Sequence, residues 1–297
     1  MVLATLSVKE RTCLNGLKQN RGASFAVVAV IYLLAAVAGI AVYRVLPFDW
    51  WLALLLADVA ATVLVFIFSV LLGNASVYDP YWSVQPVVIL VAFAMGRELT
   101  VVRVLLLAAV IFWGVRLTGN WAYTFRGLAH QDWRYTMLRE RTGVFYPLVN
   151  FTGIHMVPTL IVYGCTLPAV YAFLREAAWN GGSILFFGLS VGATAMQGVA
   201  DVQMHRFRKG KTVGFIRDGL WKYARHPNYL GEILMWWGVA GSALSVFPRA
   251  WYLAAGALAN TVLFLAVSIP LAEGKQSRKP GYGAYKKRTR MLLPFKK

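Results

Sequence analysis

The sequence RHPNYLGE at residues 225–232 runs directly into the apolar stretch ILMWW at residues 233–237. A proline at the first position of a helix is followed by amide groups without helical partners, and such amides attract anions. The cationic residues beside it strengthen that attraction. The same helix carries Glu232 below the membrane surface, where an ionisable side chain is costly and usually functional. The segment therefore predicts a membrane helix that begins at an anion-binding site.

The composition indicates a membrane protein. The chain has 297 residues, of which 59% are hydrophobic and 14% are charged, whereas soluble domains carry about a quarter charged residues. Its apolar runs of about 20 residues match the roughly 30 Å hydrocarbon core of a bilayer. The charged residues gather in a few short segments, so we expect an all-α, polytopic membrane helix bundle without a second, soluble domain.

The apolar runs predict about eight transmembrane helices. We place them at residues 25–46, 50–72, 83–96, 101–120, 146–173, 182–201, 230–247 and 251–271. With the N-terminus in the cytoplasm, the inside segments hold four, four, seven and nine Lys and Arg residues, which is 24 of the 30, and the outside turns hold five. This asymmetry follows the positive-inside rule and predicts that both termini are cytoplasmic. The third helix is the weakest, because prolines and a glycine shorten or bend it, so seven helices is the alternative.

The net charge of +18 would suit a nucleic-acid partner, but the topology already accounts for where the cations lie. We therefore expect no nucleic acid and no protein partner, only membrane lipid and a lipophilic small molecule. Cys13 in the tail and Cys165 in a helix fall at different membrane levels, so we interpret both as free thiols. The first apolar run lacks a convincing cleavage site and is expected to stay as a helix in the bacterial inner membrane or its equivalent.

Six ionisable residues lie within or at the edge of the predicted helices, and each is costly there. Asp58 lies nearest the middle of the membrane without a cation near it in its own helix. We interpret it as a hydrogen-bonded carboxyl that joins two helices. The other five fall toward cytoplasmic ends, where one cytoplasm-facing cavity could collect them: Asp79, Arg116, Asp201, Glu232 and Glu273.

A second polar entrance, NASVYDPYWS, occupies residues 74–83. One interpretation is a helix cap, with Asp79 immediately before Pro80 at the first helical position. The other is catalysis, because Tyr78 and Tyr81 flank the Asp79 carboxyl and a hydroxyl beside a carboxylate is the pairing expected of a proton donor. The residues leave both interpretations open.

A polar helix face follows at residues 201–209, where Asp201, His205 and Arg208 are spaced i, i+4 and i+7. A solvated basic face and a ligand groove both fit this pattern. The next segment interleaves glycines with cations, among them Lys211, which suits phosphate groups. Neither GxGxxG nor a P-loop motif is present, so a nucleotide would be bound by the membrane fold itself. The four histidines lack metal-ligand spacing, so we expect no metal site.

Taken together, these motifs resemble the DUF1295 branch of the steroid 5α-reductase family. The matching stretches are residues 74–82, 113–117, 132–135, 201–209, 219–232 and 270–289. The most specific are RHPNYLGE and the tail motif GYGAY at residues 281–285. The resemblance covers about residues 74–297. We therefore divide the chain into an N-terminal tail with two extra helices, 1–72, and a steroid-reductase-like membrane domain with the cofactor site, 73–297.

The resemblance implies an oxidoreductase that uses NADPH to reduce a carbon–carbon double bond conjugated to a ketone. The substrate would be a lipophilic enone such as a 3-oxo steroid or a related isoprenoid, with the cofactor in the cytoplasmic half of the bundle. Carried over by motif, with His205 added from the polar face, the cofactor-binding residues are Asp201, His205, Arg208, Arg225, His226, Asn228, Tyr229, Glu232, Glu273, Tyr282 and Tyr285.

Steroid 5α-reductases polarise the substrate carbonyl with a glutamate early in the bundle and a tyrosine in the following helix. In this chain Asp79 falls at the glutamate and Trp113 falls near the tyrosine. An indole N–H can donate a hydrogen bond but cannot deliver a proton as a phenol can. We therefore expect Tyr78 or Tyr81 to act with Asp79 as catalytic residues. The residues assigned to the substrate pocket are Trp82, Trp113 and Arg116.

Two other classes of function remain in view. Isoprenylcysteine carboxyl methyltransferases have motifs similar to the RHPxY and tail motifs of this chain, but they bind S-adenosylmethionine. Those enzymes favour paired glutamates in the tail, whereas Glu273 is followed here by Gly274, and the basic segment suits a phosphorylated dinucleotide better. A non-catalytic lipid-binding or transport protein would explain buried charges but not their position on one side with a basic rim.

Overall fold

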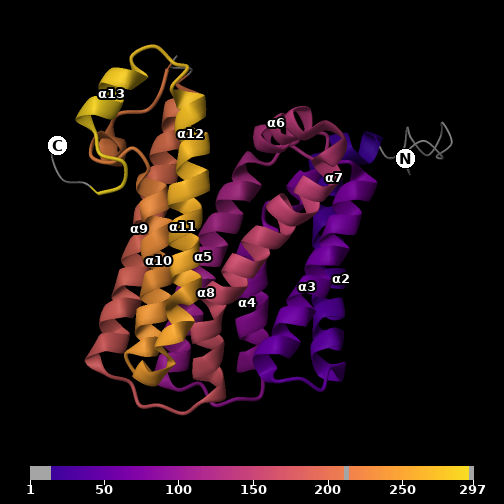
Figure 1. The fold of residues 1–297 in the computed structure, drawn as a ribbon, viewed down its shortest axis with the longest axis vertical. Helices are drawn as coiled ribbons and strands as arrows, with labels where there is room; N and C mark the ends of the chain where they lie inside the picture. Colours follow the sequence, from indigo (N-terminus) through magenta and orange to yellow (C-terminus); the bar gives the residue numbers. More distant parts are fainter. Residues whose placement is uncertain (1–14, 211–213, 294–297) are drawn as a thin grey trace. The chain divides into compact units, whose positions relative to one another are not determined.

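The computed structural model describes residues 15–210 and 214–293, which form helices joined by short loops and contain no strand (Figure 1). The all-helical prediction is confirmed for these residues. Each of the eight predicted helices has a counterpart: α2 (Arg21–Val45), α3 (Trp50–Leu72), α4 (Tyr81–Ala94), α5 (Val101–Thr124), the run α7 (Tyr146–Val149), η4 (Asn150–Met156) and α8 (Val157–Leu174), α9 (Gly181–Lys209), α10 (Pro227–Leu244), and the run η6 (Pro248–Ala254), α11 (Ala255–Leu263), η7 (Phe264–Ser268) and α12 (Ile269–Gln276).

Six helical segments of the described chain are long and apolar enough to cross a membrane. They are Arg21–Val45, Trp50–Leu72, Val101–Thr124, Trp133–Leu174, Gly181–Lys209 and Pro248–Gln276. The protein is therefore an integral, multi-pass membrane protein. Helix α4 is too short for this group at 14 residues and contains Pro86, and α10 also falls outside it. The count of eight and the orientation of the termini stay predictions.

Local sequence explains where several of these helices begin and end. Helix α2 begins after Asn20, whose side chain accepts a hydrogen bond from the Ala23 amide at 2.9 Å. Helix α9 begins with a capping box, in which Asn180 and Ser183 each accept from the other's backbone amide. Helix α3 ends at Gly73, where the chain turns with φ +63°, a conformation that favours glycine.

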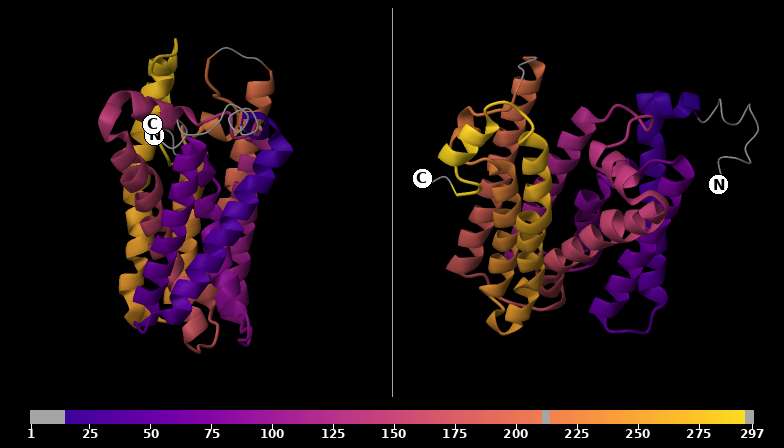
Figure 2. Two further views of the ribbon diagram at one scale, coloured as in Figure 1. Left: turned by 90° about the vertical axis from the view of Figure 1, so that its right-hand side faces the viewer. Right: turned by 45° about the horizontal axis from the view of Figure 1, so that its top comes forward.

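The described chain divides into two compact units. Of the described residues, unit 1 comprises 15–88 and 117–163, and unit 2 comprises 89–116, 164–210 and 214–293. In unit 1, α2 and α3 lie side by side (Figures 1 and 2). The short helix η2 (Ala75–Tyr78) is bonded to α2, since the Tyr32 hydroxyl of α2 donates to the Val77 carbonyl at 2.6 Å. The predicted division at residue 72 stays a prediction.

Unit 2 is built around α9 and α10, which lie against each other along their length (Figure 2). Glycines of α10 allow this approach: a Cβ atom at Gly231 or Gly238 would lie 2.8 Å from a carbonyl oxygen of α9. Ser190 of α9 donates to the Met235 carbonyl at 3.1 Å. Small residues and hydroxyl groups commonly hold membrane helices together in this way.

Adding a methyl group at this contact should destabilise unit 2. Gly238→Ala would push the new Cβ into the Phe186 carbonyl and the Ser190 side chain, and overpacking of this kind costs about 1–3 kcal/mol. Gly188→Ala, on α9 itself, is the matched control because nothing lies within 4 Å of its added Cβ. Thermal unfolding in detergent should show a lower midpoint for the first variant alone. Equal midpoints would contradict the close packing.

Within the described residues, two π-helical segments interrupt the helices, and a proline follows each one. Pro158 comes two residues after η4, and Pro270 comes two residues after η7. A proline lacks an amide hydrogen and clashes with the carbonyl four residues earlier, and a wider turn relieves the clash. Such turns occur frequently at functional sites. Cys165 is buried and free, as predicted, whereas Cys13 lies outside the described residues.

Candidate functional site

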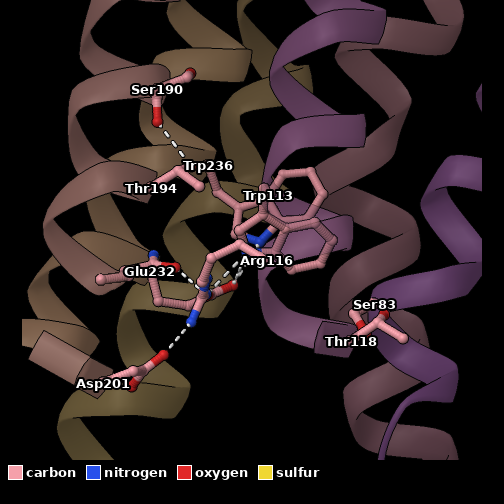
Figure 3. Close-up of polar contacts among 10 residues, drawn as sticks. Ser83, Trp113, Arg116, Thr118, Ser190, Thr194, Asp201, Glu232 and Trp236 are labelled. Carbon is pink, nitrogen blue, oxygen red and sulfur yellow. Dashed lines mark hydrogen bonds and ion pairs between the residues drawn. The ribbon is translucent and has the colours of Figure 1, made fainter. Parts of the chain in front are cut away.

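The Glu232 carboxylate is the centre of a buried polar network in unit 2 (Figure 3). It lies in the second turn of α10, which begins at Pro227. The indole N–H of Trp113 donates to Glu232 Oε2 at 2.9 Å, and the indole N–H of Trp236 donates to Oε1 at 3.1 Å. Trp236 follows Glu232 by four residues, so the two share a helix face. Sequence reasoning overlooked this pairing.

Arg116 of α5 joins this carboxylate to a second one. Its guanidinium lies 2.8 Å from Asp201 Oδ2 and 3.6 Å from Glu232 Oε2, and it also donates to the Gln197 side-chain oxygen. Three of the five ionisable residues expected in one cavity, Arg116, Asp201 and Glu232, are thus brought together. We call these three residues, with Gln197 and the two tryptophans, the Glu232 network.

The Glu232 network retains hydrogen-bond donors that no described residue uses. Arg116 Nε and Gln197 Nε2 are both buried without a partner. An unpaired buried donor costs about 1–3 kcal/mol. A bound group with acceptor oxygens would therefore be favoured at this place. Further along α9, His205 is half-buried and Arg208 is exposed.

A second ionic cluster in unit 2 ties the chain's tail to the start of α10. Glu273 Oε1 accepts from Arg225 Nε at 2.7 Å and lies 3.4 Å from His226 Nε2, and Lys286 Nζ lies 2.5 Å from Oε2. Arg225 also donates to the backbone oxygens of Lys286 and Thr289. The four charged or titratable side chains, Arg225, His226, Glu273 and Lys286, are called the tail cluster below.

Backbone contacts hold the same two segments together. The amides of Arg225 and His226 donate to the carbonyls of Arg290 and Met291 at 2.9 and 3.1 Å. The helix α13 (Tyr282–Arg288) is fixed to the neighbouring η5 (Gly219–Lys222) by the Tyr285 hydroxyl, which donates to the Trp221 carbonyl at 2.5 Å. The contacts of Glu273 are with the tail cluster and not with the Glu232 network.

Aromatic residues surround the start of α10. The rings of His226 and Tyr229 are stacked with centroids 5.3 Å apart, and Tyr229 lies 5.0 Å from Phe264. Tyr282 is buried beside Tyr285. Asn228 is half-buried in the first turn, where helix amides lack helical partners. Stacked rings beside the start of a helix suit a planar ligand that also carries negative charge.

A basic rim lies next to this end of unit 2. Lys279 Nζ donates to the Gly214 carbonyl at 2.7 Å, and burial together with the nearby Arg208 lowers the pKa of Lys279. Arg217 and Lys222 are exposed. Lys211, which the sequence analysis placed among the phosphate-binding cations, lies outside the described residues. The rim provides cations whose mutual repulsion an anionic ligand would relieve.

Acidification should weaken the tail cluster through His226. Burial, opposed by the contact with Glu273, lowers the pKa of His226 from 6.5 to about 4. The unfolded chain therefore binds this proton at a higher pH than the folded protein does, so the free energy of unfolding should fall as the pH drops from 6.5 toward 4. Unfolding midpoints measured across this interval should show a weaker pH dependence for His226→Gln. Identical dependence in both proteins would contradict this account, and His130→Gln at an exposed position is the control.

The Asp79 carboxyl belongs to unit 1 and is paired with a tyrosine that the sequence analysis did not select. The Tyr135 hydroxyl of α6 (Trp133–Thr142) donates to Asp79 Oδ1 at 2.5 Å. Burial raises the pKa of Asp79 to about 6, although the nearby Arg134 opposes the increase. Tyr135 lies in the stretch 132–135 that carries part of the family resemblance. That stretch was the one available signal for it.

Tyr78 and Tyr81 do not contact Asp79 through their hydroxyl groups. The Tyr78 hydroxyl lies 2.8 Å from Thr159 Oγ1, and the Tyr81 hydroxyl donates to Asp58 Oδ1 at 3.4 Å. Asp58 also accepts from Gln85 of α4 at 2.5 Å, which confirms the interpretation of Asp58 as a carboxyl that joins two helices. The prediction that Tyr78 or Tyr81 pairs with Asp79 is therefore wrong, because the tyrosine hydroxyl bonded to Asp79 is that of Tyr135.

The interpretation of Asp79 as the cap of α4 stays a prediction. Asn74 caps the preceding η2, because its side chain accepts from the Ser76 amide at 2.8 Å. The Asp79 side chain accepts from the Tyr135 hydroxyl and is also hydrogen-bonded to Ser76. Of the residues assigned to a substrate pocket, Trp82 packs against the hydrophobic core of unit 1, and Trp113 and Arg116 belong to the Glu232 network.

Comparisons with known proteins agree with these motifs. The family model described as "Protein of unknown function (DUF1295)" matches residues 65–289. An uncharacterized protein of Schizosaccharomyces pombe is 27% identical to this chain over 197 residues, which covers 57% of this chain and 57% of that protein. The chain therefore matches little more than half the length of that relative. No solved structure matches.

Proposed function

The chain belongs to the DUF1295 family, which is steroid 5α-reductase-like, and on this premise we propose that it is an NADPH-dependent membrane reductase. Its substrate would be a lipophilic enone, such as a 3-oxo steroid or a related isoprenoid. The observation that carries the proposal is the pair of polar centres in unit 2, the Glu232 network and the tail cluster, which lie on helices bordered by a basic rim.

The residues of unit 2 suit a phosphorylated dinucleotide. The start of α10, with Asn228 in its first turn, and the exposed rim cation Arg208 fit negatively charged phosphates. The stacked His226 and Tyr229 offer an aromatic face. The unused donors Arg116 Nε and Gln197 Nε2 fit acceptor oxygens. NADPH, when bound, would supply the hydride that the reaction adds to the β-carbon of the enone.

Within unit 1, Asp79 and Tyr135 suit proton donation to a carbonyl oxygen, which becomes more negative when a hydride adds to the conjugated double bond. A carboxyl with a pKa of about 6 is partly protonated at neutral pH. Tyr135 donates to Oδ1 of Asp79, and the proposal has the other oxygen, Oδ2, carry the proton that passes to a substrate carbonyl. The proposal therefore assigns the acid to Asp79 and its positioning to Tyr135.

Thermal stabilisation of the purified protein in detergent tests the cofactor. A ligand that binds only the folded protein at 100 times its Kd stabilises it by about 2.7 kcal/mol. NADPH should therefore raise the unfolding midpoint, and Arg208→Gln should reduce the increase, whereas Arg249→Gln, at an exposed site in unit 2, should not. Stabilisation by S-adenosylmethionine without stabilisation by NADPH would favour a methyltransferase. Stabilisation by neither would favour lipid binding or transport.

A further inference from the structure

A buried histidine in unit 1 carries a ring nitrogen that no described residue uses. His155 belongs to the π-helical segment η4 and is completely buried. Its Nδ1 atom lies 2.9 Å from the Asn150 carbonyl oxygen, while its Nε2 atom has no hydrogen-bond partner. The proposed reduction does not involve this residue.

The hydrogen bond at Nδ1 determines what Nε2 can bind. A carbonyl oxygen only accepts hydrogen bonds, so Nδ1 must carry a proton. Among the described residues, no carboxylate contacts the buried ring to favour a second proton, so the neutral form protonated at Nδ1 is the stable one. In that tautomer Nε2 has a bare lone pair. It therefore needs a donor, and a ligand ketone, which has none, cannot pair with it.

The surroundings of His155 contain donors, but these are committed to one another. The His155 ring lies between Tyr78 and Phe66, with centroid distances of 4.7 and 5.3 Å. The Tyr78 hydroxyl is paired with Thr159 Oγ1, which lies 3.1 Å from Thr62 Oγ1. The charged neighbour in this region, Asp58, is occupied by Gln85 and Tyr81.

The same π-helical segment contains a second buried polar atom without a partner. Asn150 Oδ1 is buried and unpaired, like His155 Nε2. Both atoms accept hydrogen bonds, and leaving a buried acceptor unpaired is unfavourable. Two such acceptors in six residues point to a hydrogen-bond donor of a ligand rather than to helix packing.

We propose that His155 Nε2 accepts a hydrogen bond from the hydroxyl group of a lipid alcohol bound in unit 1. This rests on the proposed function only in that the same lipid would also carry the enone. The ligand class is thereby narrowed from any lipophilic enone to one with a hydroxyl group. A hydroxyl is neutral, so it can enter an apolar region, and it supplies the donor that Nε2 lacks.

Equilibrium binding to the protein in lipid nanodiscs, without NADPH, tests this proposal. The probes are two matched pairs: testosterone with androstenedione, and geranylgeraniol with geranylgeranial. In each pair a hydroxyl is replaced by a carbonyl. At least one alcohol should bind about tenfold more tightly than its carbonyl partner, as expected for one buried hydrogen bond of about 1.4 kcal/mol. Equal affinity within both pairs, or no binding of any probe, would overturn the proposal.

Two conservative variants separate the two ring nitrogens. His155→Asn keeps an amide donor near the position of Nδ1 but has no acceptor at the position of Nε2, so the preference for the alcohol should disappear. His155→Gln places an amide oxygen near Nε2 and should retain it. His130→Asn makes the same change at an exposed histidine of unit 1 and should leave the preference unchanged. An unchanged preference in His155→Asn would overturn the proposal.

A measurement on the unsubstituted protein covers the case in which a variant fails to fold. Nitrogen-15 NMR of labelled histidine should show the Nε2 resonance of His155 moving when the alcohol is added and staying in place with the carbonyl partner. A resonance that both probes leave unmoved would show that an ordered water alone occupies the position. These binding experiments omit NADPH and therefore do not depend on turnover. If the protein prefers the alcohol but reduces no enone in a separate assay with NADPH, only the proposed reductase activity is contradicted.

Discussion

Replacing Arg116 by glutamine should lower the free energy of unfolding by up to about 3 kcal/mol, the low end of the cost of breaking a buried ion pair, because this pair is only partly buried. The Arg116 guanidinium lies 2.8 Å from Asp201 and 3.6 Å from Glu232. Without it, two neighbouring carboxylates would remain in a poorly solvated place. Chemical unfolding in a mild detergent would measure the loss.

Two comparisons make this result specific to the Glu232 network. Arg249→Gln changes an exposed arginine of the same unit and should alter stability by less than about 0.5 kcal/mol. Adding Glu232→Gln to Arg116→Gln should recover part of the loss, since one of the stranded charges is removed. If Arg116→Gln were as stable as Arg249→Gln, the ion pairs would not hold this part of unit 2 together.

Replacing Asp79 by asparagine should lower kcat by about 10²–10⁴-fold, the usual contribution of a positioned acid, while leaving the affinity for NADPH unchanged. The amide keeps the shape of the side chain but cannot supply the proton. Asp58→Asn is the matched control, because Asp58 is also a buried carboxyl of unit 1 but is bound to Gln85 and Tyr81. Turnover that survived in Asp79→Asn would remove this residue from the chemistry.

The pH dependence of the reduction rate provides a second test of the Asp79 carboxyl. The pKa of Asp79 is raised from 3.8 to about 6, chiefly by burial, so the carboxyl is protonated below about pH 6 and loses its proton above it. The rate of the reduction step should therefore fall as the pH rises beyond 6. Tyr135→Phe removes the hydrogen bond to Oδ1 and should shift the pH at which the rate falls. A profile identical to that of the unsubstituted protein would leave Tyr135 without a positioning role.

The helices of this protein could be predicted from the apolar runs, because a membrane requires long uninterrupted segments. The pairing of Asp201 with a cation and the hydrogen bonding of Asp58 could also be anticipated, since a buried charge needs a partner. The identity of that cation, Arg116 of a different helix, required the packing of α5 against α9. Spacing within one helix contains no information about such contacts.

The tyrosine partner of Asp79 was missed for a geometric reason. Tyr78 and Asp79 are consecutive around the end of a 3₁₀-helix, where neighbouring side chains point about 120° apart. Adjacency in sequence therefore separates these two groups, and Tyr135, 56 residues away, reaches the carboxyl instead. Likewise the indole of Trp113, expected to face substrate, donates to Glu232. A search for a 3.6-residue hydrophobic period cannot predict the π-helical turn at His155, although the nearby Pro158 was a signal for an irregular turn.

The most direct measurement of the proposed reduction follows the transferred hydrogen. The protein in lipid nanodiscs would receive NADPH deuterated at both C4 positions of the nicotinamide, together with 3-oxo-4-ene steroids and isoprenoid enones. The account predicts that the unsubstituted protein forms a saturated ketone with one deuterium on the former β-carbon. The Asp79→Asn variant should form much less of this product. A saturated ketone without deuterium, or no saturated ketone from any of these enones while NADPH remains bound, would contradict it.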